Sequence, residues 1–561
     1  MRVLLVNTNR KADLMTAPPI GLCYVATATR SAGHEVRVLD LCFAGRHAAK
    51  NLRASISSFA PDVVGLSVRN VDNANMLRPV SYLPGVRELV AQVRRLSAAP
   101  VVLGGSGASL MPEAVLRHVG ADAVVVSDGE VSFLRLLDAL ASGNSMAGIP
   151  GVGLIQKARF HLSPPDFPPF RFEAPDIGHW VDMEPYERLG GSYNVQSKRG
   201  CPYRCIYCTY NSSLEGHRLR RRDPHEVVDE IEEAVLKHRP RTVEFVDSVF
   251  NDPPDHMRTI LEEIIRRPWK ADFTAMGVQP LHLDREMLDL MWQAGFRSFM
   301  ITPESASDTM LSSYRKGFCR DQVIQAAEAL AHTRFSVWWC FLLGGPGETH
   351  ATLQETLDFC RQYLRLKRGS ARHVAQLFFG VRLYPSTDLW RSALREGIIA
   401  PDADPIQSLW YVSPELNVRH ALDQMEAAAA VCPEIMLGYD EGYLLFSNLA
   451  AGLCRLLRKP PPYWRLVRYL NAYALKLGLR FTVRPKDLAQ RIENILRRQT
   501  LTSRRSVQTG RAPGSWVPKN QEATRSTKGL TAKAPAAPPP VEIHYFPDES
   551  KGEHRSKDAQ S

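Results

Sequence analysis

The chain has 561 residues, of which 44% are hydrophobic and 23% charged, as in an ordinary soluble globular protein. This length is too great for one hydrophobic core and predicts three or four domains. The net charge of +11 belongs to the C-terminal end, because residues 451–500 carry +10 and residues 501–561 carry +4, so the first 450 residues sum to −3.

Cysteine content and hydropathy predict a cytoplasmic protein. Ten cysteines suit a secreted disulfide scaffold only in a much shorter chain. The N-terminal apolar run is too short for a signal peptide, and no run reaches the roughly 20 residues that span a bilayer. We expect buried, reduced thiols at the seven scattered cysteines: Cys23, Cys42, Cys319, Cys340, Cys360, Cys432 and Cys454.

Residues 1–150 predict a doubly wound α/β domain of Rossmann-like type. Short apolar strands alternate with helical patterns such as 20–33 and 86–96, which indicates a parallel sheet covered on both faces. The strands are 3–7, 35–41, 63–68, 101–105 and 123–129. Ligands of such sheets bind beyond the carboxyl ends of the strands, which here are rich in Gly, Ser and Asn. No G-x-G-x-x-G follows the first strand, which argues against a dinucleotide.

A second α/β run occupies residues 191–390, after a Pro- and aromatic-rich stretch, 151–190, that we interpret as a linker. Six strand–helix units indicate a partial (β/α)6 barrel with its site at the carboxyl ends of the strands. The strands are 193–198, 242–247, 272–278, 298–304, 335–344 and 375–384.

The C-terminal part divides into two segments. Residues 391–500 are mainly helical in pattern and are expected to form a substrate-binding or capping region. Residues 501–561 are rich in Ser, Thr, Lys and Pro and contain the run APAAPPP. Such a segment cannot bury enough apolar area to fold alone, so we expect disorder.

Three cysteines follow the first strand of the predicted barrel, in the stretch CPYRCIYC. Cys201, Cys205 and Cys208 have the spacing C-x3-C-x2-C. A structural zinc ribbon needs a second pair of ligands, and none follows within 100 residues. Three thiolates on one loop can hold three irons of a [4Fe–4S] cluster and leave the fourth open for a substrate. The alternative is three buried cysteines that stand together by coincidence.

The motif resembles the signature of the radical S-adenosylmethionine (SAM) enzymes, over about residues 190–390. In that family the open iron binds the amino and carboxylate groups of SAM. By resemblance, Asp247 and Ser248 of VEFVDSVFN would hold the SAM amino group, and Glu304 of ITPESASDTMLSSYRKG its ribose or amino acid end. LLGGPGET resembles a turn near SAM, so we expect backbone contacts from Gly344, Gly345 and Pro346. The alternative is a plain Gly-Pro turn, which has the same sequence pattern.

A radical SAM barrel behind a doubly wound domain resembles the cobalamin-binding subfamily. The residues that resemble its cofactor-contacting segments are Pro19, Gly21, Ser67, Arg69, Asn70, Gly104, Gly105, Ser106, Gly129 and Glu130. Many cobalamin proteins carry D-x-H-x-x-G, whose His ligates cobalt, but the first 150 residues of this chain lack that motif. Members of the subfamily often lack it too, so the resemblance implies base-off cobalamin.

Arg69 is the candidate for the lower face of cobalt. A guanidinium stays protonated and has no free lone pair, so it would keep ligands away and favour electron-rich Co(I). Equally, Arg69 could bind a cobalamin amide or phosphate. A generic nucleotide-binding domain is a weaker rival for this part of the chain.

The resemblance implies methyl transfer from SAM, through methylcobalamin, to an unactivated carbon or to phosphorus of a metabolite, peptide or lipid. The alternatives are a cobalamin-dependent cyclase or rearrangement enzyme, a tRNA-modifying methylthiotransferase-like enzyme, and a non-enzymatic cobalamin or iron–sulfur sensor. The family also implies an external electron donor, either flavodoxin- or ferredoxin-like or a chemical reductant. We expect a monomer and find no nucleic-acid motif beyond charge.

Candidate substrate contacts come from the end of the sixth strand and the region after it. These are Arg382, Tyr384 and Tyr411, although aromatic residues there are more often packing residues with one polar tip. Residues 451–500 interleave Leu, Trp and Tyr with Arg and Lys. This pattern fits a packed amphipathic helix, a helix on an anionic membrane surface, or a surface that attracts an acidic substrate.

Overall fold

The computed structural model describes most of the chain up to residue 509. The described residues are 1–10, 16–76, 79–364, 372–432, 434–438 and 485–509, with 449, 452–454, 456, 457 and 477. Most of the basic segment 451–484 and all of the tail from residue 510 lie outside them, so the expectations of membrane contact and of disorder there stay predictions. Within the described part, no helix is long and apolar enough to cross a membrane.

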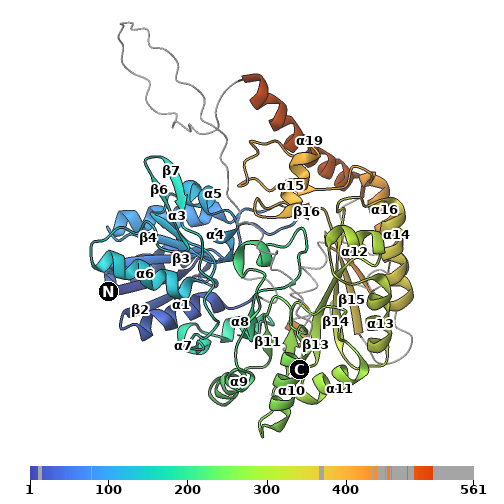
Figure 1. The fold of residues 1–561 in the computed structure, drawn as a ribbon, viewed down its shortest axis with the longest axis horizontal. Helices are drawn as coiled ribbons and strands as arrows, with labels where there is room; N and C mark the ends of the chain where they lie inside the picture. The colour runs from blue at the N-terminus through green and yellow to red at the C-terminus, as the bar shows by residue number, and fades with distance from the viewer. Residues whose placement is uncertain are drawn as a thin grey trace, which may run out of the picture. The chain divides into compact units, whose positions relative to one another are not determined.

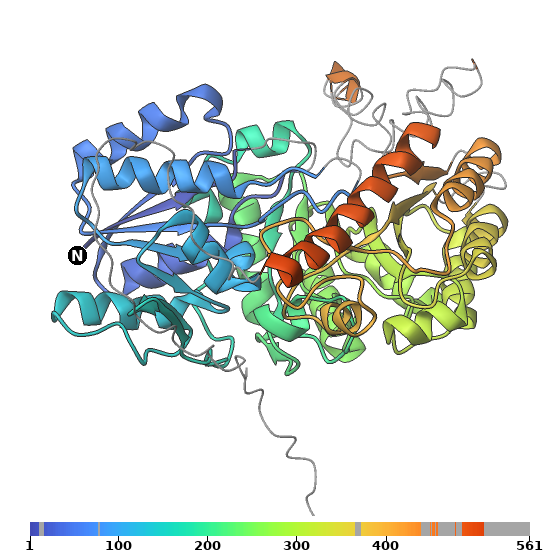
Figure 2. The same ribbon diagram turned by 90° about the horizontal axis from the view of Figure 1, so that it is seen from above.

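The first five strands of the N-terminal domain form a parallel, doubly wound sheet, as the sequence predicts. Its strands run in the order β2-β1-β3-β4-β5. Figure 2 shows helices on both faces of this sheet. One face packs against α2, α3 and α5 and the other against α1 and α6. The elements are β1 (Arg2–Asn7), α1 (Ile20–Ser31), β2 (Glu35–Asp40), α2 (Ala48–Phe59), β3 (Val63–Ser67), α3 (Leu83–Leu96), β4 (Val101–Gly104), α4 (Ser106–Leu110), α5 (Pro112–Val119), β5 (Ala123–Val125) and α6 (Gly129–Ala141).

The prediction that residues 151–190 form a linker is partly wrong, because the first of these residues extend this sheet. Strands β6 (Val152–Gln156) and β7 (Arg159–Leu162) form an antiparallel hairpin on β5. The hairpin turns at Lys157 and Ala158, which both have positive φ angles, of 46° and 65°. Tight hairpin turns of this kind usually carry Asn or Gly, so the sequence gives little sign of it. The rest of the linker holds two short helices, α7 (Ile177–Trp180) and α8 (Glu184–Arg188).

The barrel contains the six predicted strands and a seventh that the sequence did not reveal. The strands are β8 (Tyr193–Val195), β11 (Val243–Phe245), β12 (Phe273–Ala275), β13 (Ser298–Glu304), β14 (Ser336–Leu343), β15 (Arg372–Phe379) and β18 (Ile435–Leu437). All pair in parallel, in two sheets that isolated bridges Phe273–Phe296 and Val278–Ile301 join. β18 has three residues, too few to show a periodicity.

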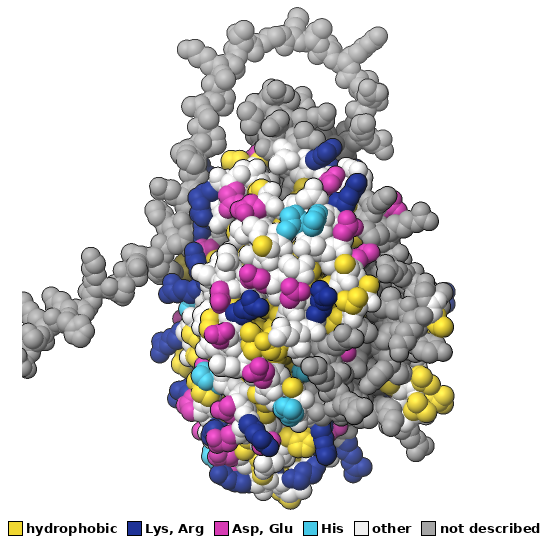
Figure 3. All heavy atoms as spheres, turned by 90° about the vertical axis from the view of Figure 1, so that its right-hand side faces the viewer, with side chains coloured by type: hydrophobic (Ala, Val, Ile, Leu, Met, Phe, Trp, Pro, Cys, Tyr) yellow, Lys and Arg dark blue, Asp and Glu magenta, His cyan; other side chains and the backbone are white. Residues whose placement is uncertain are grey.

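Amphipathic helices cover the outside of the barrel (Figure 1). They are α9 (Pro224–His238), α10 (Pro254–Arg266), α11 (Arg285–Ala294), α13 (Arg320–Ala331), α14 (His350–Phe359) and α16 (Val418–Val431). Their apolar sides and the outward-facing strand residues form the largest core, for example Ile231, Leu353 and Leu422 against Phe245 and Phe341. On the face shown in Figure 3, basic and acidic side chains are interspersed, in keeping with the nearly balanced charge of the first 450 residues.

The C-terminal region is mixed rather than only helical. An antiparallel ribbon joins β16 (Val381–Arg382) to β17 (Trp410–Tyr411), and α15 (Asp388–Arg395) lies between them in sequence. The last described helix, α19 (Pro485–Thr509), packs on α16. It continues nine residues into the segment expected to be disordered, because Leu488, Ala489 and Ile492 bury an apolar face that nucleates it.

The expectation of buried thiols holds for six of the seven scattered cysteines and is wrong for Cys319, which is exposed. Cys319 is the N-cap residue of α13, and its backbone N–H donates a hydrogen bond to Gln322 Oε1 at 2.9 Å. A helix start at the surface therefore determines its exposure.

Candidate cofactor and active site

The three predicted cluster ligands lie on one loop at the carboxyl end of the first barrel strand. Cys201 follows β9 (Lys198–Arg199) and is 7% exposed, while Cys205 and Cys208 are partly buried. Burial, with the nearby Cys208 and Cys205 thiols, raises the pKa of Cys201 to about 12. The ammonium of Lys316, itself buried, acts in the opposite direction on all three thiols. The loop therefore gathers three thiols beside one buried cation.

Glu304 joins this loop through a hydrogen-bonded network. Tyr207 Oη donates to Glu304 Oε1 at 3.0 Å, and Lys316 Nζ lies 3.8 Å from the same oxygen. Lys316 Nζ also donates to Tyr207 Oη at 3.2 Å and to Thr302 O at 2.9 Å. Glu304 has a φ of 67°, in the left-handed region, where β13 loses register with β14. Strained residues of this kind cluster at functional sites.

Asp247 anchors the strand before the cysteine loop. Its Oδ1 accepts hydrogen bonds from the backbone N–H groups of Ser197, at 2.7 Å, and Lys198, at 3.2 Å. Its Oδ2 accepts from Ser197 Oγ at 2.6 Å and pairs with Lys198 Nζ at 3.2 Å. Ser248 Oγ donates to Glu215 Oε2 at 2.6 Å. Both predicted residues thus support the loop, and direct contact with the SAM amino group stays a prediction.

The turn predicted to lie near SAM packs against the same network. The carboxylate of Glu348 accepts hydrogen bonds from the N–H groups of Gly344 and Gly345. Ser313 Oγ donates to Pro346 O at 2.7 Å. A Cβ on Gly345 would collide with the ring of Tyr314, which lies edge-on to Tyr207 at 5.5 Å. Glycine is therefore required there for close packing.

The predicted turns after β3 and β4 meet at the carboxyl edge of the front sheet. Val68 N–H donates to Gly104 O at 2.8 Å, and Ser106 Oγ donates to Arg69 O at 2.8 Å. Gly105 has a φ of 91°, and a Cβ there would lie 2.7 Å from Val68 O. Ser67 O accepts a hydrogen bond from Thr8 Oγ1 at 2.7 Å, while the side chains of Arg69 and Asn70 are exposed.

Arg69 lies near enough to the barrel for its charge to act on two side chains there. Its charge acts to lower the pKa of Tyr210, two residues after Cys208, and of Glu244 on β11. Farther along the same loop, Met76 is 2% exposed and packs into the barrel core, where its sulfur lies against Gly380. The loop after β3 therefore reaches the carboxyl ends of the barrel strands.

The remaining residues predicted to contact cobalamin have different surroundings in the front domain. Pro19 precedes α1, and Gly21 lies in its first turn with open space where a Cβ would be. Gly129 begins α6 against Val25. Glu130, by contrast, is 3% exposed and forms a bidentate ion pair with an arginine of β9, so we correct its expected role from a cobalamin contact to a structural contact.

The three predicted substrate residues are occupied by protein contacts. Arg382 Nε pairs with Asp72 Oδ2 at 2.9 Å, with both side chains nearly fully buried. Tyr384 packs against the core of the front domain. Tyr411 Oη donates to Glu396 Oε2 at 2.5 Å. Tyr411 lies in the same apolar cluster as Ile206 and Tyr207 of the cysteine loop, whereas Arg382 and Tyr384 turn toward the front domain.

Sequence reasoning missed the side chains that line the barrel interior. Met276 and Phe378 are 39% and 37% exposed, although the strand neighbours Ala275 and Leu377 are buried under the outer helices. Because side chains alternate along a strand, Phe378 on β15 faces the barrel interior, and Met276 directly follows β12. Glu244 also faces inward, accepts a hydrogen bond from Asn194 at 3.1 Å, and has its pKa raised to about 7 by burial. Strand alternation was the available signal.

Comparison with known proteins agrees with this geometry. The model of the radical SAM superfamily matches residues 195–360, and the model of the B12 binding domain matches residues 11–137. The chain belongs to the radical SAM enzymes that carry a cobalamin-binding domain.

Two relatives of this radical SAM enzyme illustrate the range of the family. It is 28% identical to tryptophan 2-C-methyltransferase of Streptomyces laurentii over 453 residues, which cover 70% of this chain and 74% of the relative. It is 24% identical to anaerobic magnesium-protoporphyrin IX monomethyl ester cyclase of Rubrivivax gelatinosus, over 65% and 66% of the two chains. The structure of the methyltransferase TsrM from Kitasatospora setae, with tryptophan substrate and a SAM analog bound, matches with a TM-score of 0.74 at 24% identity, covering 85% of this chain and 99% of TsrM. That likeness establishes the fold.

The residues of this enzyme fit the implied cofactors. Cys201, Cys205 and Cys208 supply three soft donors on one loop, and Lys316 supplies a cation that offsets thiolate charge. No three His, Cys, Asp or Glu side chains of the described residues are gathered as the ligands of a single metal ion are. A cluster differs from such a site, since each thiolate binds a different iron. Gly105 and Gly107 after β4 let the backbone of the loop after β3 pack closely against them, at the sheet edge where doubly wound domains bind ligands.

Proposed function

We propose that this radical SAM enzyme transfers a methyl group from SAM, by way of cobalamin, to a carbon or phosphorus atom of a small molecule, peptide or lipid. One observation carries the proposal. The loop after β3 of the cobalamin-binding domain, with Arg69 and Met76, reaches the barrel end that presents Cys201, Cys205 and Cys208. The two proposed cofactor regions would therefore lie close to each other, as transfer between them requires.

The chain's own groups have separate tasks in this proposal. Cys201, Cys205 and Cys208 would hold a [4Fe–4S] cluster, and the Glu304–Lys316 pair offers one acceptor and one donor to the polar groups of SAM. The buried surroundings of these groups exclude water, which protects reactive species and strengthens polar contacts. When bound, the cluster supplies an electron and cobalamin supplies a carrier for methyl.

Arg69 would lie under the lower face of base-off cobalamin. Its side chain is exposed, and a guanidinium cannot ligate cobalt. The rival role, a contact to a cobalamin amide or phosphate, predicts weaker cobalamin binding in Arg69→Ala and no change in Arg69→Lys. A role beneath cobalt predicts a shifted cobalamin spectrum in both variants.

Methyl transfer is favoured over cyclisation by the tryptophan methyltransferase relative, which is more similar and matches over more of both chains than the cyclase relative does. An external electron donor of the flavodoxin or ferredoxin type, or a chemical reductant, completes the proposal, and we expect the enzyme to act as a monomer.

The experiment uses protein purified without oxygen, with iron, sulfide and corrinoid measured. The reduced protein is incubated with cobalamin and with SAM labelled in its methyl group, and the label is sought on the corrinoid by mass spectrometry. We expect labelled corrinoid in the wild type and none in a variant with Cys201, Cys205 and Cys208 all changed to alanine. SAM cleavage without label on the corrinoid would instead favour a cyclase or rearrangement enzyme.

A further inference from the structure

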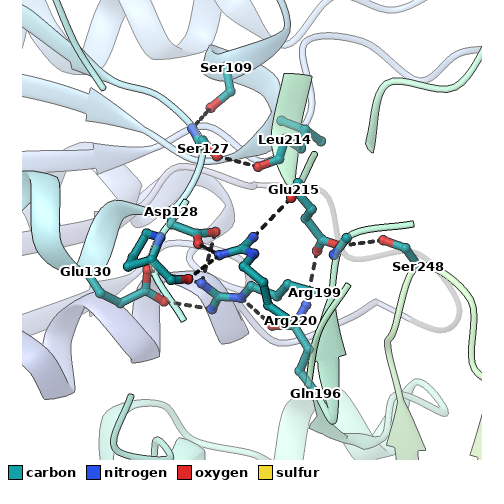
Figure 4. Close-up of polar contacts among 12 residues, drawn as sticks. Ser109, Ser127, Asp128, Glu130, Gln196, Arg199, Leu214, Glu215, Arg220 and Ser248 are labelled. Carbon is teal, nitrogen blue, oxygen red and sulfur yellow. Dashed lines mark hydrogen bonds and ion pairs between the residues drawn. The ribbon is translucent and has the colours of Figure 1, made fainter. Parts of the chain in front are cut away.

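The turn after β5 in the front domain, residues 127–130, bonds to both ends of the cysteine loop, residues 199–215 (Figure 4). At one end, Ser127 Oγ donates to Leu214 O at 2.5 Å. Leu214 closes the π-helical turn Tyr210–Leu214, which begins two residues after Cys208. Ser127 has a φ of 63° and is itself fixed, since its N–H donates to Ser109 Oγ at 3.0 Å.

At the other end, the same turn binds Arg199, which stands two residues before Cys201. Arg199 Nη2 lies 2.7 Å from Glu130 Oε1, and Nη1 lies 3.2 Å from Glu130 Oε2 and 3.1 Å from Asp128 Oδ1. The Arg199 side chain is 7% exposed. Its guanidinium carbon lies 4.2 Å from the centre of the Phe170 ring. These contacts fix the guanidinium in one orientation.

Two further residues connect this pair to the loop backbone. Glu215 Oε2 accepts a hydrogen bond from the N–H of Gly200, the residue before Cys201, at 2.9 Å. Arg220 Nη2 donates to Glu215 O at 3.1 Å, and Arg220 Nη1 pairs with Asp128 Oδ2. Asp128 therefore bonds to both arginines, and every link leads to residues next to the first cluster ligand.

Stability alone does not require such a network. Four buried charges in this arrangement, two acidic and two basic, are often no more stabilising than apolar side chains of the same volume. Hydrogen-bonded charges do, however, fix direction and register, which apolar packing does not. The acidic residues lie at the carboxyl edge of the front sheet, where a doubly wound domain binds its ligand. The network thus connects a ligand-binding edge to the cysteine loop.

We propose that Arg199 is a positioning residue that makes the front-domain turn 127–130 and the cysteine loop 199–215 move as one unit, so that binding at the cobalamin site orders the loop that holds the cluster. This inference rests on the proposed cobalamin site. Energetic coupling between two sites is reciprocal, so a formed cluster should in turn favour cobalamin binding.

The test measures hydrogen exchange of the full chain, without SAM or substrate, before and after cobalamin is added. In the wild type, cobalamin should slow amide exchange in residues 199–215 by about tenfold, because the loop opens less often once its anchor is fixed. In Glu130→Gln and Arg199→Lys, cobalamin should still bind but should slow exchange in this segment less than about twofold.

Two further variants keep the test decisive. Ser127→Gly removes the hydroxyl without burying a charge and tolerates the positive φ, so it should fold and lose part of the transmitted protection. Glu263→Gln, the matched control, weakens a partly buried ion pair between Glu263 on α10 and Arg267, which has no described contact with either segment, and should behave as the wild type. If the wild type binds no cobalamin, the proposed function fails. If it binds cobalamin but residues 199–215 exchange unchanged, or if Arg199→Lys responds as the wild type does, this inference is overturned.

Discussion

Glu348 is a buried carboxyl group whose protonation state matters for the turn near the proposed SAM site. It is 0% exposed, and burial raises its pKa to about 7 even though the Gly344 and Gly345 N–H groups lower it. Its Oε2 accepts both hydrogen bonds, while Oε1 is buried and has no partner among the described residues. The protonated form therefore suits the site.

Glu348→Gln should gain stability over the wild type as pH rises. The folded state holds the proton more tightly than the unfolded chain, whose Glu pKa is near 4.5. The stabilising contribution of Glu348 is therefore complete below about pH 4.5 and is lost as pH rises through 7. The variant does not titrate, so its advantage should grow by up to about 3 kcal/mol between pH 5 and pH 8.

Unfolding of the cofactor-free variant and wild type at several pH values measures this difference. Glu328→Gln, at an exposed position on α13, should leave the pH dependence of the wild type unchanged. A gap between Glu348→Gln and the wild type that stays constant from pH 5 to pH 8 would contradict the buried, proton-holding carboxyl.

For single residues, the role of a side chain was predictable where it depends on residues close by in the sequence. The three cysteines could be recognised because their spacing on one loop defines the chemistry. The partners of Glu130 and Arg382 could not, because Arg199 and Asp72 stand 69 and 310 residues away in the chain. A charged side chain in sequence looks the same whether it binds a cofactor or a buried partner.

At the scale of elements, α19 completes the ribbon β16–β17. Gln499, which is 7% exposed, donates from Nε2 to Trp410 O at 2.7 Å, and its Oε1 accepts from Trp410 N–H at 3.2 Å. One side chain thereby satisfies both backbone groups on the free edge of β17, as a neighbouring strand would.

Gln499→Leu should destabilise the protein by about 2–4 kcal/mol, since it leaves a buried N–H and a buried C=O without partners. Denaturant unfolding followed by circular dichroism measures the loss. Gln490→Leu is the matched control, because Gln490 is exposed on the same helix and has only a 3.4 Å contact with Asn494. Equal losses in the two variants would show that α19 acts through its length alone.

Elements were predictable in proportion to their length and periodicity. The long alternating and helical patterns of β1 to β5 and of α9 to α14 match the structure. The hairpin β6–β7 and the strand β18 were missed, because a hairpin turn without Asn or Gly and a three-residue strand leave no clear pattern. The hairpin and β18 each form by pairing with the edge strand of an existing sheet, β5 and β15 respectively.

At the scale of the whole described molecule, a buried ion pair joins the two α/β domains. Asp72, on the loop after β3, pairs with Arg382 on β16, and their side chains are 3% and 4% exposed. Ser408 Oγ donates to Asp72 Oδ2 at 3.1 Å, and Ala74 N–H donates to Asp72 Oδ1 at 2.8 Å. The loop that presents Arg69 is therefore fixed to the barrel side at its base.

Replacing only one partner of this ion pair should lower the free energy of unfolding by more than expected from the loss caused by replacing both partners. Asp72→Asn leaves a buried guanidinium without its counter-charge and should cost about 3–5 kcal/mol. The double variant Asp72→Asn/Arg382→Met should lose less than the sum of the single variants. A double-mutant cycle on unfolding free energies measures the coupling. The exposed pair Glu184–Arg188, treated the same way, should couple by no more than about 0.5 kcal/mol. Additive losses for Asp72 and Arg382 would contradict the pair.

The sequence by itself determined the two-domain α/β architecture and the cysteine loop, because these depend on short-range periodicity and on spacing within one loop, while the cofactor family followed from the resemblance of its motifs. Only the tertiary structure decided which carboxylates are paired with arginines, as Glu130 and Asp72 are, and which strand side chains turn into the barrel. The physical reason is that a buried charge is defined by the partner that neutralises it, and that partner comes from a distant part of the chain.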